Sequence, residues 1–402
     1  MIIEIIIAVL LGILLGTITG LTPGIHVNLV SALIVALSPT FLLYVNPLFL
    51  IVTIISLALT HTFLDALPSI FLGAPDESQA LGVLPGHRML IKGKGYDAVK
   101  LTLNGSLFSL ILSVIVFPFA LIIIPFIYEP FTPFIGWTLV VIVIYMMATE
   151  NSWRKRYWAF NIFMLSGFLG LLTLNLHMLD QPLFPLLSGL FGVSTLLLSL
   201  KDSQKIPKQK FSSDTPVESR VCAKATIGAV VSGGLAGLLP GLGSSQAAVL
   251  AMNVLGKLGN EGFLLLVGGI NTVNFVFSLA TFYTIEKARN GAIAGVMEFI
   301  SEITLAQLAL FVAVCLIAGG IATILGLFLA RKFAGWMTRI PYRGLCIGIV
   351  VFIVALTFLF DGVFGLAVLT TSTAVGILPA IFSIKRSLAM GCLLLPVIVY
   401  FL

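Results

Sequence analysis

The sequence predicts an all-α polytopic membrane protein. Of its 402 residues, 59% are hydrophobic and only 9% are charged, and the mean hydropathy is +1.15. Soluble domains carry about 25% charged residues, so this chain lacks the polar side chains that would cover a water-facing surface. Its apolar runs have the length of about 20 residues that crosses a bilayer. They are continuously apolar rather than alternating, which excludes a β-barrel, and the composition excludes soluble enzymes and nucleic-acid-binding proteins.

Apolar segments are predicted along the whole chain, seven on each side of one polar stretch. The first is interpreted as a retained helix rather than a signal peptide, because it contains Glu4 and has neither a basic region before it nor a small-residue cleavage site after it. The segments lie at 2–20, 25–43, 48–66, 100–127, 134–149, 158–175 and 183–200, then at 222–239, 246–258, 263–285, 303–330, 344–360, 363–381 and 387–402.

The polar stretch divides the chain into two halves. It is rich in Lys, Ser and Pro, a composition typical of linkers, and is predicted to be a linker at 201–221. The N-terminal half covers 1–200 and the C-terminal half covers 222–402.

The two halves resemble each other in sequence. Gly16-Thr-Ile-Thr-Gly-Leu-Thr-Pro-Gly24 is echoed by Gly233-Gly-Leu-Ala-Gly-Leu-Leu-Pro-Gly241, and Ser166-Gly-Phe-Leu-Gly-Leu-Leu172 by Thr373-Ala-Val-Gly-Ile-Leu-Pro379. Two matches in the same order, together with equal numbers of segments, predict an internal duplication.

The positions of Lys and Arg favour inverted repeats. If each Pro-Gly motif lies at the tip of a hairpin, at 2–43 and 222–258, and five single spans follow each hairpin, 20 of the 22 Lys and Arg residues fall on one side. If the motifs instead cross the membrane once, only 15 do. Because short cytoplasmic loops collect Lys and Arg, we expect inverted repeats with a cytoplasmic linker. Lys287 and Arg289 are the two exceptions on the outer side.

The two Pro-Gly breaks are the predicted substrate site. Broken helices expose backbone groups that lipid cannot satisfy, and inverted repeats place substrate between such breaks near the bilayer midplane. A helix that begins after a break presents partial positive charge, which suits an anion such as a carboxylate. Close helix packing at glycines is the alternative interpretation. The candidate substrate-binding residues are Thr22, Pro23, Gly24, His26, Asn28, Pro240, Gly241, Gly243, Ser244, Ser245 and Gln246.

Further polar residues within or beside apolar segments are candidates for ion coupling or for supporting the site. His61 and Asp65 are four residues apart on one predicted helix face, and ionisable groups at such depth are usually functional or paired; they can also simply pair with each other. The segment 67–96 is too polar to span and too apolar for a free loop, so we expect it to be partly re-entrant. The candidates are His61, Asp65, Asp76, Glu77, Ser78, Asn271 and Asn274.

The sequence gives no sign of catalysis or of a bound cofactor. The four cysteines are far apart without metal-binding or disulfide spacing, and the HExxH, GxSxG and Walker motifs are absent. We therefore expect no enzyme, no metal site and no cofactor, and transport without a nucleotide site would draw on a Na⁺ or H⁺ gradient.

Motifs in the N-terminal half resemble a known family. The Gly-x3-Gly-x2-Pro-Gly motif of each half, together with Ile70-Phe-Leu-Gly-Ala-Pro-Asp-Glu-Ser78 and Leu84-Pro-Gly-His-Arg-Met-Leu-Ile-Lys-Gly-Lys-Gly95, resembles the large permease subunit of the tripartite tricarboxylate transporters, the TctA family. The chain looks like a compact branch of the kind found in archaea. The resemblance implies cation-coupled uptake of carboxylates, with an extracytoplasmic binding protein and a small membrane subunit as partners.

Together these observations predict a multi-pass cell-membrane transporter that moves a small organic anion, such as a di- or tricarboxylate, by symport with a cation. A translocase of a lipid phosphate, such as polyprenyl phosphate, is the alternative. An intramembrane enzyme built on His61 and Asp65 and a structural scaffold are weaker candidates. The lipid bilayer and the anion are expected partners, nucleic acid is not, and the oligomeric state is left open.

Overall fold

The protein is all-α, as the composition and apolar runs predict. The computed structural model describes residues 2–22, 27–73, 79–81, 83–200, 207–211, 217–239, 242–256, 258–337 and 342–402. No strand occurs among these residues, and eight of their helical segments are long and apolar enough to cross a bilayer. The prediction of a polytopic helical membrane protein is confirmed.

The helices of the first half follow the predicted segments closely, with short irregular pieces between them. They are α1 (Ile2–Leu21), α2 (Val27–Ala36), α3 (Ser38–Phe41), α4 (Pro47–Leu64), the π-helical turn η1 (Pro68–Leu72), α5 (Val83–Ile91), α6 (Gly95–Phe131), the 3-10 turn η3 (Thr132–Phe134), α7 (Ile135–Ala148), α8 (Trp153–Leu174), α9 (Leu183–Leu187), the π-helical η4 (Ser188–Val193) and α10 (Ser194–Ser199).

The second half has the same order of long and short helices. They are α11 (Ser219–Leu238), α12 (Ser244–Leu255), α13 (Gly259–Ile285), α14 (Gly291–Met297), α15 (Leu305–Met337), α16 (Tyr342–Phe382), the 3-10 turn η5 (Arg386–Met390) and α17 (Gly391–Phe401). Helix α16 is two helices joined at Gly362, whose φ of 58° breaks the helix. This break lies between the predicted segments 344–360 and 363–381.

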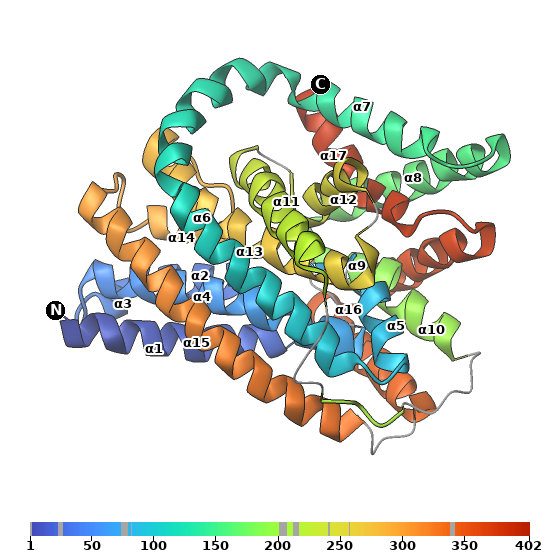
Figure 1. Cartoon of the computed structure of the whole chain (residues 1–402), viewed down its shortest axis with the longest axis horizontal. Helices are drawn as coiled ribbons and strands as arrows, with labels where there is room; N and C mark the ends of the chain where they lie inside the picture. Colours follow the sequence, from blue (N-terminus) through green and yellow to red (C-terminus); the bar gives the residue numbers. More distant parts are fainter. Residues whose placement is uncertain are drawn as a thin grey trace.

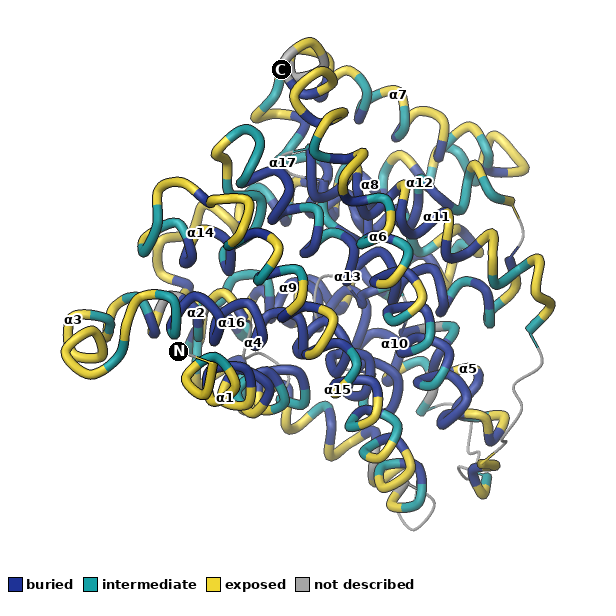
Figure 2. Tube along the Cα trace, turned by 60° about the vertical axis from the view of Figure 1, so that its left-hand side comes forward, coloured by how far each residue is buried: buried dark blue, intermediate teal, exposed yellow. Residues whose placement is uncertain are grey.

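Two buried helices, α4 and α13, form the centre of the molecule. Figure 1 shows α6 and α15 lying across them, while α1 packs along α4 and α11 packs along α13. In Figure 2 the traces of α4 and α13 are almost wholly buried, whereas α1 and α3 carry exposed residues. Helices that are apolar all round belong in such an interior, and the exposed apolar side chains of the outer helices suit a lipid environment.

The packing of α1 on α4 recurs as the packing of α11 on α13. A Cβ at Gly20 would lie 2.9 Å from Leu64 Cβ and 3.3 Å from the His61 carbonyl oxygen. A Cβ at Gly237 would lie 2.9 Å from Phe277 Cβ and 2.8 Å from the Asn274 carbonyl oxygen. His61 and Asn274 therefore occupy equivalent places in the two helix pairs.

The second sequence match also marks a repeated contact. Gly170 of α8 faces the backbone of Cys392 on α17, and Gly376 of α16 faces the backbone of Leu190 in η4. In each pair a helix from one half lies against the short helical segment of the other half, with room for no side chain between them. The contacts therefore repeat with the halves exchanged, although inversion across a membrane stays a prediction.

The predicted linker is partly docked on the first half. The Gln209 side chain accepts a hydrogen bond from the Gly95 amide at 2.8 Å and donates to the Leu90 carbonyl at 3.1 Å. The Lys210 amide donates to the Gly93 carbonyl at 2.8 Å. Residues 207–211 are thus fixed at the junction of α5 and α6.

Two short helices lie inside the fold at equivalent places in the chain. The segment predicted to be re-entrant contains η1, which continues α4 within the candidate span Pro47–Leu72, and α5, which is too short to span a bilayer. After α13, where an outer loop was expected, the chain forms α14, whose Ala292, Ile293, Gly295 and Val296 are buried. Helix α14 packs on α2, because Gly291 and Gly295 leave space for Asn28 and Ser31.

Candidate functional site

A cavity of about 260 Å³ lies between the two halves. The first half contributes residues at the start of α2 and on α4, and the second half contributes the end of α11, the start of α12, the middle of α13 and the segment leading into α14. Its lining residues are Val27, Asn28, Ala58, His61, Thr62, Ala236, Leu239, Leu242, Gly243, Ser244, Asn271, Asn274, Phe275, Arg289, Asn290 and Ala292. Small-molecule sites combine such apolar walls with a few polar groups that set orientation.

The equivalent helices α4 and α13 supply different side chains to the cavity. His61 on α4 and Asn274 on α13 both line it, one from each half. One turn earlier, Ala58 on α4 corresponds to Asn271 on α13. The duplicated framework therefore carries a lining that is not duplicated.

Hydrogen bonds hold the two central polar side chains in place. His61 Nδ1 lies 3.0 Å from the Thr19 hydroxyl on α1, and Asn274 Nδ2 donates to the Ser244 hydroxyl at 3.2 Å. Ser244 begins α12 directly after the second break. A second hydrogen bond ties α13 to the chain just before this break, because the Thr281 hydroxyl on α13 donates to the Gly237 carbonyl near the end of α11 at 2.8 Å.

Asp65 lies behind the cavity and joins the halves. Its Oδ2 accepts a hydrogen bond from Asn271 Nδ2 at 2.9 Å, and its Oδ1 accepts one from Gln79 Nε2 at 3.1 Å. Asp65 is only 2% exposed. His61 thus contacts Thr19, and Asp65 contacts the two amides, while pairing of His61 with Asp65 stays a prediction.

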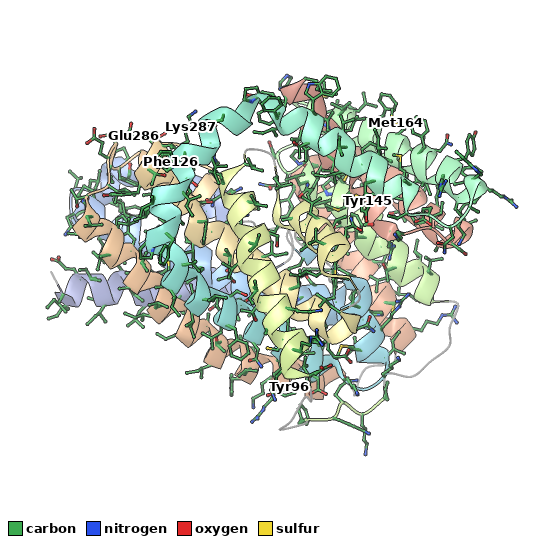
Figure 3. All side chains as sticks on the ribbon, turned by 45° about the horizontal axis from the view of Figure 1, so that its top comes forward. Tyr96, Phe126, Tyr145, Met164, Glu286 and Lys287 are labelled. Atoms are coloured by element: carbon green, nitrogen blue, oxygen red, sulfur yellow. The ribbon has the colours of Figure 1, made fainter. Side chains whose placement is uncertain are left out.

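Arg289 brings a positive charge to the cavity wall. Its Cζ lies 4.7 Å from the centre of the Tyr128 ring on α6, and Lys287 Nζ lies 4.8 Å from the same ring. Figure 3 shows Lys287 and Glu286 beside Phe126, at the end of α6 remote from Tyr96. Arg289 Nε and Nη2 are buried and donate no hydrogen bond within the part of the chain that the structure describes. The Tyr128 ring thus holds the guanidinium by a cation–π contact, and its buried N–H groups call for an acceptor.

The structure brings together six of the predicted site residues. Asn28, Gly243, Ser244, His61, Asn271 and Asn274 line the cavity. Thr22, Ser245, Gln246 and Asp65 lie near it in the chain or behind it without lining it. Pro23, Gly24, His26, Pro240, Gly241, Asp76, Glu77 and Ser78 lie outside the described residues.

Arg289 and Asn290 were missed by the sequence analysis. The Asn290 side chain accepts a hydrogen bond from the Ile293 amide at 2.9 Å and so begins α14. Arg289 did leave a signal, because it is one of the two basic residues that the positive-inside count places on the outer side. A basic residue that contradicts the topological bias is a candidate for a direct role.

Helices that cross a bilayer around a polar cavity shared by two halves define a polytopic membrane protein of the transporter type. Comparison with known families then specifies the class. Residues 6–391 match the family described as "Tripartite tricarboxylate transporter TctA family". The chain belongs to the TctA family and is a membrane transporter permease, as its motifs suggested.

A related archaeal protein shares most of the chain. It is "Uncharacterized protein MJ1079" of Methanocaldococcus jannaschii, 29% identical over 358 residues that cover 87% of this chain and 88% of that protein. This similarity fits the archaeal type of branch that the sequence suggested. No solved structure matches the chain.

Proposed function

We propose that this permease is a secondary transporter of a small carboxylate anion, of the di- or tricarboxylate kind that the family name denotes, and that the anion binds in the cavity between the halves. The observation that carries the proposal is Arg289, whose buried Nε and Nη2 lack a partner in the described chain. A buried charge requires a partner, and a carboxylate matches the planar donor edge of a guanidinium.

The remaining lining supports binding of the same chemistry. Asn28, Asn274 and Ser244 offer neutral hydrogen-bonding groups around the charge, and α12 begins at the cavity, where the partial positive charge of a helix N-terminus favours an anion. A volume of about 260 Å³ corresponds to about nine waters at about 30 Å³ each. The cavity therefore suits a compact metabolite.

The wider arrangement follows from the same proposal. The halves are inverted repeats in the cell membrane with a cytoplasmic linker, and a Na⁺ or H⁺ gradient drives uptake. An extracytoplasmic binding protein and a small membrane subunit act as partners, as the family name "tripartite" indicates. Repeated contacts such as Gly170 with Cys392 and Gly376 with Leu190 support the duplicated framework.

Uptake into liposomes tests the function. Purified protein is reconstituted and offered radiolabelled citrate, malate and lactate under Na⁺ and pH gradients. We expect gradient-driven uptake of at least one anion by the wild type, and at least a tenfold lower affinity in Arg289→Gln, because losing the charge-assisted hydrogen bonds costs about 1.5–3 kcal/mol.

The control is Lys287→Gln, which removes a cation from the same Tyr128 ring but not from the cavity lining. It should leave affinity close to wild type. Equal affinity in Arg289→Gln and wild type would remove the anion site from this cavity. Thermal stabilisation by polyprenyl phosphate but by no carboxylate would instead favour the lipid-phosphate translocase.

A further inference from the structure

Asp65 is a buried carboxylate at which three chain segments beside the site meet. It ends α4, accepts a hydrogen bond from Asn271 on α13 of the other half, and accepts another from Gln79, which precedes α5. Three separate chain segments thus converge on one side chain. Carboxylates within membrane-spanning segments commonly belong to substrate or proton pathways.

Asn271 connects this carboxylate to the anion cavity. Its side chain lines the cavity and at the same time donates to Asp65 Oδ2 at 2.9 Å, with a longer contact to the Thr62 carbonyl at 3.5 Å. Thr62 lines the cavity as well. An anion bound there is therefore separated from Asp65 by a single amide group.

Protonation of Asp65 at Oδ2 changes what Asn271 offers to the cavity. An ionised carboxylate only accepts hydrogen bonds, and both contacting amides are oriented as donors. When Oδ2 gains a proton it becomes a donor, so Asn271 has to present its oxygen to Asp65 and turn its N–H groups away. Those N–H groups then become available to an anion in the cavity.

Charge acts in the same direction as hydrogen bonding. Two negative charges separated by one side chain repel strongly where water is scarce, so an anion in the cavity favours the protonated form of Asp65. By linkage, the protonated form favours the bound anion equally. Anion and proton are therefore taken up together.

Other charged or titratable groups lie on α4 and on the described helices packed against it. His61 is one turn away and contacts Thr19, and Arg289 lines the cavity. Glu4 contacts Asn46 at the far end of α4, and Arg331 of α15 contacts Tyr96. On the described helices packed against α4, the further charged or titratable residues are Glu261 and Tyr283 on α13, Lys332 and Cys315 on α15, and Tyr96, Asp97, Lys100, Tyr128 and Glu129 on α6.

We propose that the coupling ion is a proton, that Asp65 carries it, and that Asn271 conveys its presence to the anion cavity. The inference rests on the proposed function. A proton from the side where the anion enters binds a carboxylate oxygen of Asp65 and forms the acid; it leaves on the opposite side with the anion. One proton then accompanies each transport cycle.

Liposome transport of radiolabelled citrate, malate and lactate tests the proposal. Membrane potential is held at zero with valinomycin and equal potassium on both sides, and Na⁺ is equal as well. The wild type should accumulate an anion about tenfold per proton for a gradient of about one pH unit. Asp65→Asn, which mimics the protonated form, should lose this accumulation but retain exchange of labelled for unlabelled anion, and its anion affinity should no longer depend on pH.

Matched variants separate coupling from folding. Asp361→Asn changes another buried carboxylate, which accepts a hydrogen bond from the Gln181 amide at 2.8 Å and does not line the cavity. This variant should retain accumulation. Asn271→Ser should weaken the pH dependence of affinity while Asp65 is intact. Exchange lost together with accumulation in Asp65→Asn would show a structural role and overturn the proposal.

Other outcomes are equally decisive. Accumulation that persists in Asp65→Asn, or that is lost in His61→Gln while Asp65→Asn retains it, overturns the assignment to Asp65. Uptake driven by a Na⁺ gradient and not by pH overturns the choice of ion while the proposed function stands. Absence of movement of any anion by the wild type overturns the proposed function and this inference together.

Discussion

Substituting alanine for Gly170 or Gly376 tests the repeated helix contact directly. A Cβ at Gly170 would lie 2.6 Å from the carbonyl carbon of Cys392, and a Cβ at Gly376 would lie 2.7 Å from Leu190 Cα. Ordinary contacts of a Cβ begin at 3.4 Å, and the carbonyl oxygens of Cys392 and Leu190 lie even closer to these Cβ positions than the carbons do, so each pair of helices would have to separate by more than an ångström. The atoms in the way belong to the backbone and cannot rotate aside.

The magnitude follows from two opposing effects. Overpacking of this kind costs about 1–3 kcal/mol, whereas replacing a glycine within a helix by alanine gains about 0.5–1 kcal/mol. We expect each variant to be destabilised by about 1–2 kcal/mol, and both by similar amounts. Gly320 of α15 provides the control, because nothing lies within 4 Å of its Cβ position, so Gly320→Ala should be neutral or slightly stabilising.

Thermal unfolding of the purified variants in one detergent measures the effect. Both Gly170→Ala and Gly376→Ala should unfold at lower temperature than the wild type, and Gly320→Ala should not. Wild-type stability in both would refute the close approach of the helices. Destabilisation of only one would refute the equivalence of the two contacts.

Three further predictions concern individual side chains. Burial lowers the pKa of His87 to about 4, so between pH 6.5 and 4 only the unfolded state binds the proton. The free energy of unfolding should therefore be at its full value above this window and fall by about 3 kcal/mol across it as pH decreases. In a pH series of thermal melts, His87→Gln should show no such slope. Thr281→Val removes the hydrogen bond to the Gly237 carbonyl and should cost about 1 kcal/mol, measured by the same melts, and an unchanged melting temperature would contradict that bond. Asn290→Ala removes the side chain that accepts the Ile293 amide and should cost about 1 kcal/mol; Asn290→Ser should recover most of it, and equal stability of the two variants would argue against a capping role.

Much of the fold was predictable because hydrophobic length decides it. The runs at 134–149 and 303–330 became α7 and α15 with ends shifted by a few residues, since an apolar run in lipid has to satisfy its backbone internally as a helix. The π-helical turns η1 and η4 were not predictable, because their register depends on tertiary contacts rather than on composition.

The short helices α5 and α14 were not predictable from hydrophobic length. Each is shorter than a bilayer span; α5 mixes polar and apolar residues, whereas α14 contains only glycine and apolar residues, so no rule based on span length identifies either. Their burial depends on neighbours brought from elsewhere, such as α2 against α14.

The candidate site was predictable to the same extent. Asn28 and Ser244 stood out because they follow the Pro-Gly breaks, and His61 because it is ionisable within an apolar run. Arg289 stood out only as one of two basic residues on the predicted outer side, and its place on the cavity wall distinguishes it from Lys287, which contacts the same Tyr128 ring. Proximity of that kind belongs to the fold and not to the local sequence.

The unequal lining of a duplicated framework has a consequence for direction. In the proposed inverted arrangement, identical halves would make the outward-open and inward-open forms mirror each other in energy. Contacts that occur in both halves contribute equally to the two forms, so they cancel from the energy difference between the outward-open and inward-open forms. Only positions at which the two halves differ can favour one form. Examples are His61, whose equivalent is Asn274, and Ala58, whose equivalent is Asn271. In that arrangement, single substitutions at these cavity positions can change which face is open at rest while the helical framework stays the same.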